Sequence, residues 1–211
     1  MENFGLIETM LWEEGSYFLL ALHLGRLKKS AEHFNFPYAE EFISGALESS
    51  SSDFNLLRQY KTRLLFDRAG KVNIASEILP PISEEVVKIT FSEKKTDKTD
   101  IFLYHKTTKR SLYEEEFNKW RAKGFFDVIF SNQEDEITEG AITNVMIQKG
   151  ENYWTPPLSC GVLAGVYRQH LINTQEVPLK EKVLRKEDLL KADKIYIMNS
   201  VRKMIPAAIK L

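Results

Sequence analysis

Two adjacent prolines, Pro80 and Pro81, most constrain how this chain of 211 residues can fold. Neither proline can donate a backbone hydrogen bond to a sheet, and a proline restricts the residue before it to an extended conformation. Segments typical of strands and of helices alternate on both sides of this pair. The sequence therefore predicts a mixed α/β (α+β) fold in two domains, a small one over residues 1–82 and a larger one over 83–211.

Hydrophobic periodicity and turn residues predict the individual elements. In the first domain they are a hairpin with strands at 6–12 and 17–20, helices at 22–34 and 38–48, and strands at 60–66 and 72–78. In the second domain they are strands at 86–91, 126–130, 144–148, 152–155, 177–184 and 194–198, and helices at 111–122, 165–172 and 186–191. The serine run 49–52 and the polar segment 94–100 are expected to be loops.

The charge balance argues against two classes of partner. The chain has 29 Lys and Arg residues and 30 Asp and Glu residues, for a net charge of -1. Nucleic acids and anionic membrane surfaces both attract a basic excess, so neither is an expected partner. The single cysteine, Cys160, excludes an internal disulfide, and we find neither a secretory signal nor a run of ~20 apolar residues for a membrane span. We therefore expect a soluble, cytoplasmic protein.

Lys106 is the first candidate for chemistry. It follows the short apolar segment 101–104, which we expect to be a strand, and lies in the stretch HKTTKR. A lysine that is partly buried at a strand end has a lowered pKa and becomes a nucleophile. The ordinary alternative is a solvated lysine in a basic loop.

Two glycine-containing segments are candidates for ligand binding. Gly140 would let the backbone approach a ligand closely, while the preceding Glu139 supplies a fixed negative charge. Gly161 and Gly165 precede a predicted helix start, where backbone amides can surround a phosphate. Alone, each segment is more typical of an ordinary turn.

Two polar positions complete the set of candidates. Arg26 lies beside the apolar face of a predicted helix, and the segment 199–202 follows the predicted strand at 194–198. A polar loop at a strand end is suited to ligand contacts. Alone, however, the two positions are typical of a surface arginine and of an ordinary turn.

The order of these segments resembles that of a known enzyme family. The sequence resembles the fold-type IV pyridoxal-phosphate enzymes, also called class IV aminotransferases, in five motifs: His-x-x-Arg-Leu at 23–27, a lysine at 106, Glu-Gly-x-x-x-Asn at 139–144, Gly-Val-x-Arg at 165–168 and Asn-Ser at 199–200. The resemblance covers about residues 6–207. The stretches GLIETMLW and HKTTKR are most similar to the aminodeoxychorismate lyases.

This resemblance implies a two-domain fold like that of D-amino acid aminotransferase, with pyridoxal phosphate between the domains, and a homodimer. It also implies that Lys106 is the Schiff-base lysine and that Glu139 faces the pyridine nitrogen. The other cofactor-binding residues that it implies are Arg26, Asn144, Val166, Tyr167, Asn199 and Ser200. No metal is expected.

Within the family, the resemblance implies a 4-amino-4-deoxychorismate lyase of folate biosynthesis, which gives p-aminobenzoate and pyruvate. Lys106 would remove the proton from the amine-bearing carbon, with Thr9 as the candidate proton donor and Arg110 and Arg202 as candidate partners of the substrate carboxylates. One alternative is a transaminase of D- or branched-chain amino acids, which uses the same cofactor residues. The other is a non-catalytic binding protein with the same fold.

The sequence departs from the family pattern at two places. Typical members begin with further residues ahead of the position of Glu8 and Thr9, so we expect a first domain that is trimmed at the N-terminus. Tyr167 stands where many transaminases have a threonine that contacts the phosphate. The amides of the helix start are therefore expected to supply more of that contact.

Overall fold

The chain separates into two compact units. The computed structural model describes residues 4–210, so Met1–Asn3 and Leu211 of the two expected domains lie outside the described residues. The first unit extends to Pro81 and also includes His105–Lys109, and the second comprises Ile82–Tyr104 and the described residues from Arg110 onward. Both units contain helices and strands, which confirms the mixed α/β class.

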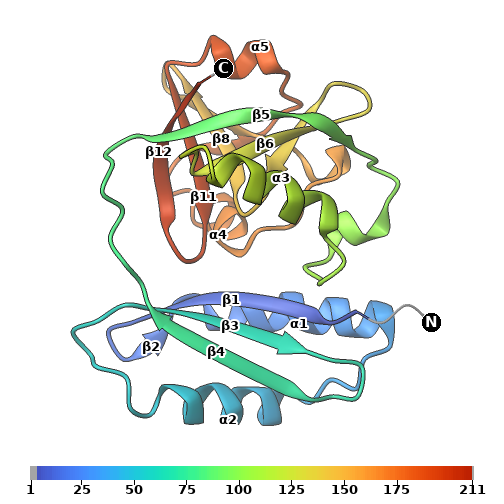
Figure 1. Ribbon diagram of the computed structural model, residues 1–211, viewed down its shortest axis with the longest axis vertical. Coiled ribbons are helices and arrows are strands. Elements are labelled where there is room, and N and C mark those ends of the chain that lie inside the picture. The colour runs from blue at the N-terminus through green and yellow to red at the C-terminus, as the bar shows by residue number, and fades with distance from the viewer. Residues whose placement is uncertain (1–3, 211) are drawn as a thin grey trace. The chain divides into compact units, whose positions relative to one another are not determined.

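The first unit is built on a four-stranded antiparallel sheet with the strand order β2-β1-β3-β4. Its elements are β1 (Leu6–Glu13), β2 (Ser16–Tyr17), α1 (Leu20–Phe34), α2 (Glu40–Ser51), β3 (Tyr60–Phe66) and β4 (Val72–Ile78). Figure 1 shows α1 running alongside β1. The apolar core of the unit includes Leu6, Leu27 and Leu64, which are almost completely buried.

The segment that carries Lys106 joins this first unit, although we expected it in the second domain. The amide of Ile7 donates to the carbonyl of Lys106 at 2.8 Å, and the amide of Thr108 donates to the carbonyl of Gly5 at 2.9 Å. The segment thus lies beside β1, far from it in sequence. Pairing of this kind depends on the tertiary fold and has no local sequence signal.

Two segments differ from expectation because side chains hydrogen-bond to the nearby backbone. Residues Ile101–Tyr104 form a 3₁₀ helix, η1, instead of a strand, and the Asp100 carboxylate accepts the amide of Phe102 at 2.9 Å at its start. Most of the serine run belongs to α2 instead of a loop. The hydroxyl of Ser50 donates to the carbonyl of Leu47 at 2.8 Å, so serine satisfies a backbone group of the last helical turn.

The second unit is built on an eight-stranded mixed sheet with the strand order β10-β9-β8-β11-β12-β5-β6-β7. Its strands are β5 (Val87–Thr96), β6 (Asp127–Asn132), β7 (Ile137–Gly140), β8 (Asn144–Lys149), β9 (Asn152–Thr155), β10 (Leu179–Glu181), β11 (Lys194–Asn199) and β12 (Lys203–Ile209). Its helices are η1, α3 (Ser111–Arg121), η2 (Leu158–Cys160), α4 (Val166–Thr174) and α5 (Lys186–Leu190). Figure 1 shows α3 in front of β5 and β6.

Strand β6 is buried along its whole length. Successive side chains of a strand point to opposite faces of the sheet. Ile129 accordingly joins one apolar cluster with Val145, while Val128 and Phe130 join another with Tyr113 of α3. Apolar side chains therefore cover both faces of this strand, which begins at Asp127.

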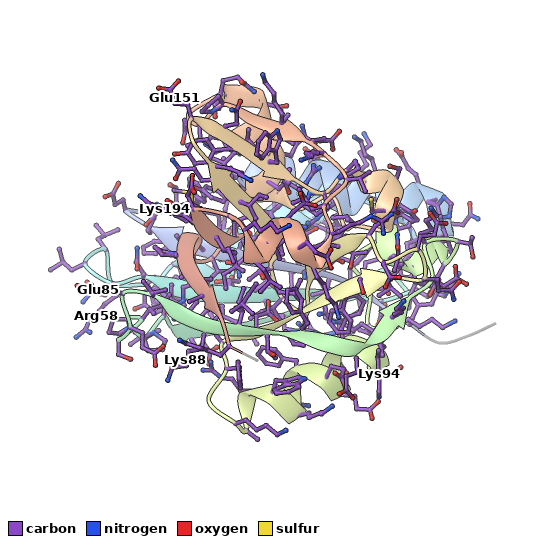
Figure 2. The ribbon with its side chains drawn as sticks, turned by 90° about the horizontal axis from the view of Figure 1, so that it is seen from above. Arg58, Glu85, Lys88, Lys94, Glu151 and Lys194 are labelled. Carbon is purple, nitrogen blue, oxygen red and sulfur yellow. The ribbon has the colours of Figure 1, made fainter. Side chains whose placement is uncertain are left out.

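Strand β5 is longer than expected, because it continues through residues 94–96. Its register against β6 shifts between Phe91 and Lys95, and such an irregularity interrupts the alternation that reveals a strand in sequence. Figure 2 shows Lys88 and Lys94 toward the two ends of β5. Lys94 Nζ lies 2.8 Å from Glu115 Oε2 on α3, so the polar residues taken for a loop hold a surface ion pair.

The final strand, β12, was not expected, because it contains Pro206. Pairing of β12 with β5 begins at Ala207, so that ladder loses no donor at the proline. On its other side β12 is antiparallel to β11, with Pro206 opposite Tyr196. Within residues 4–210, no helix is both long and apolar enough to cross a membrane.

A substitution in β3 tests the core of the first unit. Leu64 is 0% exposed, so Leu64→Ala leaves a cavity and is expected to lower the free energy of unfolding. The expected loss is ~2–5 kcal/mol. Leu57→Ala is the matched control, because Leu57 is 93% exposed. Its expected effect is below ~0.5 kcal/mol. Urea denaturation measures both values, and equal effects would contradict the position of Leu64 in the core.

Candidate active site

A buried charged cluster joins β1 to α1 in the first unit. Arg26 donates from Nε to Glu8 Oε1 at 2.9 Å and from Nη2 to Glu8 Oε2 at 2.6 Å, and His23 Nδ1 lies 2.6 Å from Glu8 Oε2. His23 and Arg26 are three residues apart on α1 and therefore share a face of the helix. The guanidinium predicted to bind the cofactor is thus oriented by a two-atom contact with a strand carboxylate.

The charges of this cluster are set by burial and by the neighbours. Burial alone would raise the pKa of Glu8, but the charge of Arg26 and the hydrogen bonds with His23 and Arg26 lower it to about 2. Burial lowers the pKa of His23 in spite of the nearby carboxylate. Near neutral pH, Glu8 is therefore ionised and His23 is neutral.

One atom of His23 remains available for a further contact. An ionised carboxylate can only accept, so Nδ1 carries the ring proton and Nε2 is an acceptor. Nε2 is buried and has no hydrogen-bond partner among residues 4–210. The positive charge of Lys106 contributes to the lowered pKa of His23, so the lysine lies near this ring. The first unit thus gathers a lysine, a guanidinium and a buried acceptor.

Helix α1 also fixes the residue before Lys106. His105 Nδ1 lies 2.9 Å from Ser30 Oγ, and the His105 ring stacks on His33 with ring centres 4.6 Å apart. Together with the backbone pairing to Ile7, these contacts hold the lysine segment on both sides.

Thr9, the candidate proton donor, is half-buried on β1. It follows Glu8, so its side chain points to the opposite face of the strand. The side chains of Thr9 and of Glu8, which Arg26 contacts, therefore leave β1 on opposite faces.

Glu139 is the centre of the candidate site in the second unit. It lies on β7 and is 7% exposed. Oε1 accepts a hydrogen bond from the hydroxyl of Tyr113 at 3.2 Å, and Oε2 accepts from Asn144 Nδ2 at 3.2 Å and from the amide of Leu163 at 3.3 Å. Donors directed at both oxygens stabilise a negative charge there.

The loop between Glu139 and Asn144 wraps around the buried carboxylate of Asp127. Asp127 accepts hydrogen bonds from the Thr143 hydroxyl at 2.6 Å and from the amides of Ala141 and Ile142 at 2.9 and 3.2 Å. Burial raises the pKa of Asp127 to about 6 in spite of these donors. A Cβ at Gly140 would lie 2.3 Å from Asp127 Oδ2, so only glycine fits at this point of the loop.

Asn144 links this loop to the start of α4. Its Nδ2 also donates to the carbonyl of Leu163 at 3.1 Å. A Cβ at Gly165, the residue before α4, would lie 1.8 Å from Asn144 Oδ1. The absence of a side chain there brings the backbone at the predicted phosphate site close to Asn144. The first amides of a helix lack partners within it, so those of Val166 and Tyr167 are suited to an anion.

The turn between β11 and β12 is organised by Asn199. Its Oδ1 accepts the amides of Val201 and Arg202 at 3.0 and 2.8 Å, and its Nδ2 donates to the carbonyl of Ile142 at 3.3 Å. Asn199, a predicted cofactor-binding residue, thus shapes its own turn and connects that turn to the loop after Glu139. Ser200 is buried in the turn, and Arg202 is half-buried.

Arg110, a predicted substrate partner, contacts two other residues of the second unit. Its Nη2 donates to the carbonyl of Ala141, and its guanidinium lies over the Tyr113 ring at 5.5 Å. It therefore braces the loop after Glu139. Within residues 4–210, no group of three or more His, Cys, Asp or Glu side chains could hold a metal ion.

Sequence reasoning did not identify Tyr113, Asp127 or His23 as separate site residues. Tyr113 lies three residues after Arg110 at the start of α3, a spacing that places two side chains together on a helix. That spacing is the signal that could have revealed it. Asp127 has no such signal, because its partners come from another strand and loop.

Replacement of Glu8 tests the charged cluster through pH. The pKa of Glu8 is lowered in the folded protein, so its ionisation stabilises the fold above about pH 4.5, and that contribution is lost as the pH falls to about 2. The contribution is about 3 kcal/mol. Glu8→Gln is expected to unfold more easily at neutral pH and to lose stability less steeply over this window. Glu77→Gln, at an exposed ion pair, is the control, and urea denaturation across the pH range is the measurement.

The close approach at residue 165 predicts a steric effect. Gly165 has φ -62, so an alanine has no backbone strain there and only the contact with Asn144 Oδ1 opposes it. Gly165→Ala is expected to lower the free energy of unfolding by ~1–3 kcal/mol. Gly45→Ala is the control, because nothing lies within 4 Å of its added Cβ and alanine favours a helix. A thermal unfolding temperature for Gly165→Ala as high as that of Gly45→Ala would refute the steric argument.

Known proteins are similar to this chain along nearly its whole length. Residues 5–209 match the family Amino-transferase class IV. The chain is 30% identical to a putative aminodeoxychorismate lyase of Schizosaccharomyces pombe, over 97% of this chain and 89% of that protein. It is 25% identical to a probable branched-chain-amino-acid aminotransferase of Thermotoga maritima, over 94% of this chain and 74% of that protein.

A solved structure supports the same conclusion. A putative amino-acid aminotransferase from Mesorhizobium loti has a TM-score of 0.91 at 30% identity, and the match covers 98% of this chain and 100% of that one. The fold-type IV architecture expected from the sequence is thereby confirmed. The chain therefore belongs to the amino-transferase class IV family of pyridoxal-phosphate-dependent enzymes.

Proposed function

We propose that this chain is a 4-amino-4-deoxychorismate lyase that uses pyridoxal phosphate and gives p-aminobenzoate and pyruvate. The observation that carries the proposal is the similarity to the Schizosaccharomyces pombe putative lyase, at 30% identity over 97% of the chain. The stretch HKTTKR around Lys106, which is most similar to lyases, supports the same choice.

The donor groups of the chain fit pyridoxal phosphate. A protonated pyridine nitrogen needs a buried anionic acceptor, and Glu139 is a carboxylate held by donors at both oxygens. A phosphate needs positive charge and backbone amides; the first unit offers the guanidinium of Arg26, and the second unit offers the amides at the start of α4. Asn144 Oδ1 lies where a Cβ at Gly165 would be, so the start of α4 is held close to the side chain that donates to Glu139. Lys106 supplies the amine that would react with the aldehyde of pyridoxal phosphate.

The protein side chains then have separate roles. When bound, the cofactor accepts the electron pair that is released at the substrate carbon. Lys106 Nζ takes the proton from the amine-bearing carbon, and Thr9 Oγ1 gives a proton to the departing enolpyruvyl group. The bond from the ring carbon to the enolpyruvyl oxygen breaks, and the substrate ring becomes aromatic. Glu139 keeps its negative charge throughout.

Of the two arginines expected to bind substrate carboxylates, we favour Arg202. The guanidinium of Arg110 already donates to the carbonyl of Ala141. Arg202 is half-buried, and burial lowers its pKa, as expected for a cation that is partly removed from water. A substrate carboxylate would compensate for that desolvation.

A transaminase of D- or branched-chain amino acids is the second candidate. The Mesorhizobium loti structure, whose whole length is matched, supports it. The two activities share their cofactor residues and differ in their need for an amino acceptor. Absence of any cofactor binding would favour the third candidate, a binding protein. The homodimer, the cytoplasmic location and the folate pathway stay predictions.

The first experiment mixes the protein with pyridoxal phosphate and aminodeoxychorismate, without a 2-oxo acid. We expect p-aminobenzoate and pyruvate at rates proportional to enzyme. Lys106→Ala is expected to slow their formation by ~10²–10⁴-fold, because the base is lost. Lys109→Ala, in the same stretch, is the control and should retain activity. Borohydride reduction followed by peptide mass spectrometry should find the cofactor attached to Lys106.

The outcomes separate the candidates. Cofactor attached to Lys106 without p-aminobenzoate would contradict the lyase and favour the transaminase, which an amino-donor screen would then identify. Attachment at another lysine would contradict the role of Lys106 itself.

A further inference from the structure

The hydroxyl of Tyr113 contacts one carboxylate oxygen of Glu139, and the side chain of Asn144 and the amide of Leu163 contact the other. Tyr113 donates to Oε1 at 3.2 Å, whereas Asn144 and the amide of Leu163 donate to Oε2. Tyr113 is 8% exposed, so this hydrogen bond forms away from solvent. A carboxylate held at one oxygen alone can rotate about its last bond, and a donor at the other oxygen restricts that rotation.

Tyr113 is itself held by its surroundings. Its ring contacts that of Phe130 on β6, with ring centres 4.7 Å apart, and the guanidinium of Arg110 covers it at 5.5 Å. Arg110 also donates to the carbonyl of Ala141 in the loop that follows Glu139. The start of α3 therefore contacts both the carboxylate of Glu139 and the loop that follows it.

The hydroxyl is a donor over the whole physiological pH range. Burial raises the pKa of Tyr113 well above its ordinary value, and the negative charge of Glu139 raises it further. A protonated phenol beside an ionised carboxylate can only donate to it. The direction of the hydrogen bond is therefore fixed.

We propose that Tyr113 is a positioning residue for Glu139, and that its hydroxyl holds the carboxylate in the orientation that pairs with the pyridine nitrogen of the cofactor. The proposal rests on the use of pyridoxal phosphate proposed above. Tyr113 acts through Glu139 and has no direct role in the reaction. The contribution of Tyr113 to binding affinity is therefore specific to ligands that carry a ring nitrogen.

An analogue of the cofactor makes this specificity measurable. In 1-deazapyridoxal phosphate, a C–H group replaces the ring nitrogen, so the analogue keeps its phosphate and aldehyde but cannot pair with Glu139. The ratio of the two dissociation constants, measured by equilibrium dialysis, reports the contact with Glu139 alone. We expect the wild-type protein to bind pyridoxal phosphate ~10–100-fold more tightly than the analogue.

Tyr113→Phe removes the hydroxyl and keeps the ring. We expect this ratio to fall by about tenfold, because the buried carboxylate loses a donor and its fixed orientation. Affinity for the analogue should be unchanged. Tyr17→Phe is the matched control, since Tyr17 is also 8% exposed and its hydroxyl donates to the carbonyl of Leu47 at 3.2 Å. That variant should lose stability without a change in the ratio.

A second variant keeps the test decisive if Tyr113→Phe does not fold. Replacement of Tyr113 by 3-fluorotyrosine gives a stronger donor of nearly the same size, and it should raise the ratio. A structural role alone would leave the ratio unchanged in both variants, and that result would overturn the proposal.

The failure of the proposed function has a different signature. If the wild-type protein binds neither compound, both the cofactor assignment and the role of Tyr113 are wrong. If the wild-type protein discriminates between the compounds and Tyr113→Phe discriminates equally well, only the role of Tyr113 is wrong.

Discussion

The candidate site of the second unit depends on one interaction, the wrapping of a loop around the buried carboxylate of Asp127. Removal of a carboxylate from water is unfavourable unless donors replace the lost hydration. The hydroxyl of Thr143 and the amides of Ala141 and Ile142 provide these donors. Glu139 lies just before this loop and Asn144 just after it. Asp127 therefore sets the relative positions of Glu139 and Asn144, although its hydrogen bonds go to the residues between them.

The first unit uses a buried acid in a similar way. Glu8 on β1 holds Arg26 and His23 on α1, as Asp127 holds its loop. In both units, a strand carboxylate organises the groups that are candidates for ligand binding. A charge that is satisfied within the protein gives its neighbours a fixed geometry before any ligand arrives, which lowers the cost of binding. The proposed catalytic lysine and the proposed ring-nitrogen partner are each supported by such a cluster.

The sequence revealed what local patterns determine. The expected strands at 60–66, 72–78 and 152–155 agree with β3, β4 and β9 at every boundary, because turn residues mark the hairpins on which they lie. Strand β12 was missed, because the ability of a sheet to accept Pro206 depends on where its neighbour begins to pair. The extension of β5 beyond an irregular register was missed for the same kind of reason.

The candidate site was predictable only in part, again for a physical reason. Glu139 and Asn144 are close in sequence, and the structure joins them through a hydrogen bond. Tyr113 reaches Glu139 from a helix, and its contact exists only after α3 has folded onto β6. Arg110 has the charge expected of a substrate partner, but its surroundings direct it to the carbonyl of Ala141. The type of a residue suggests its chemical role, but the neighbouring residues determine which group its side chain contacts.

The contact between Asn144 and Gly165 has a consequence for protein engineering. With 1.8 Å between Asn144 Oδ1 and a Cβ at 165, the two positions cannot be diversified independently. A library that randomises residue 165 alone, in search of a new anion preference, would contain mostly destabilised members. Accommodation of a side chain there requires a smaller residue at 144, which also removes a donor from Glu139. If the start of α4 binds the phosphate and Glu139 pairs with the ring nitrogen, as proposed, selection for a different anion at one end of the ligand would alter the electronic properties of its other end.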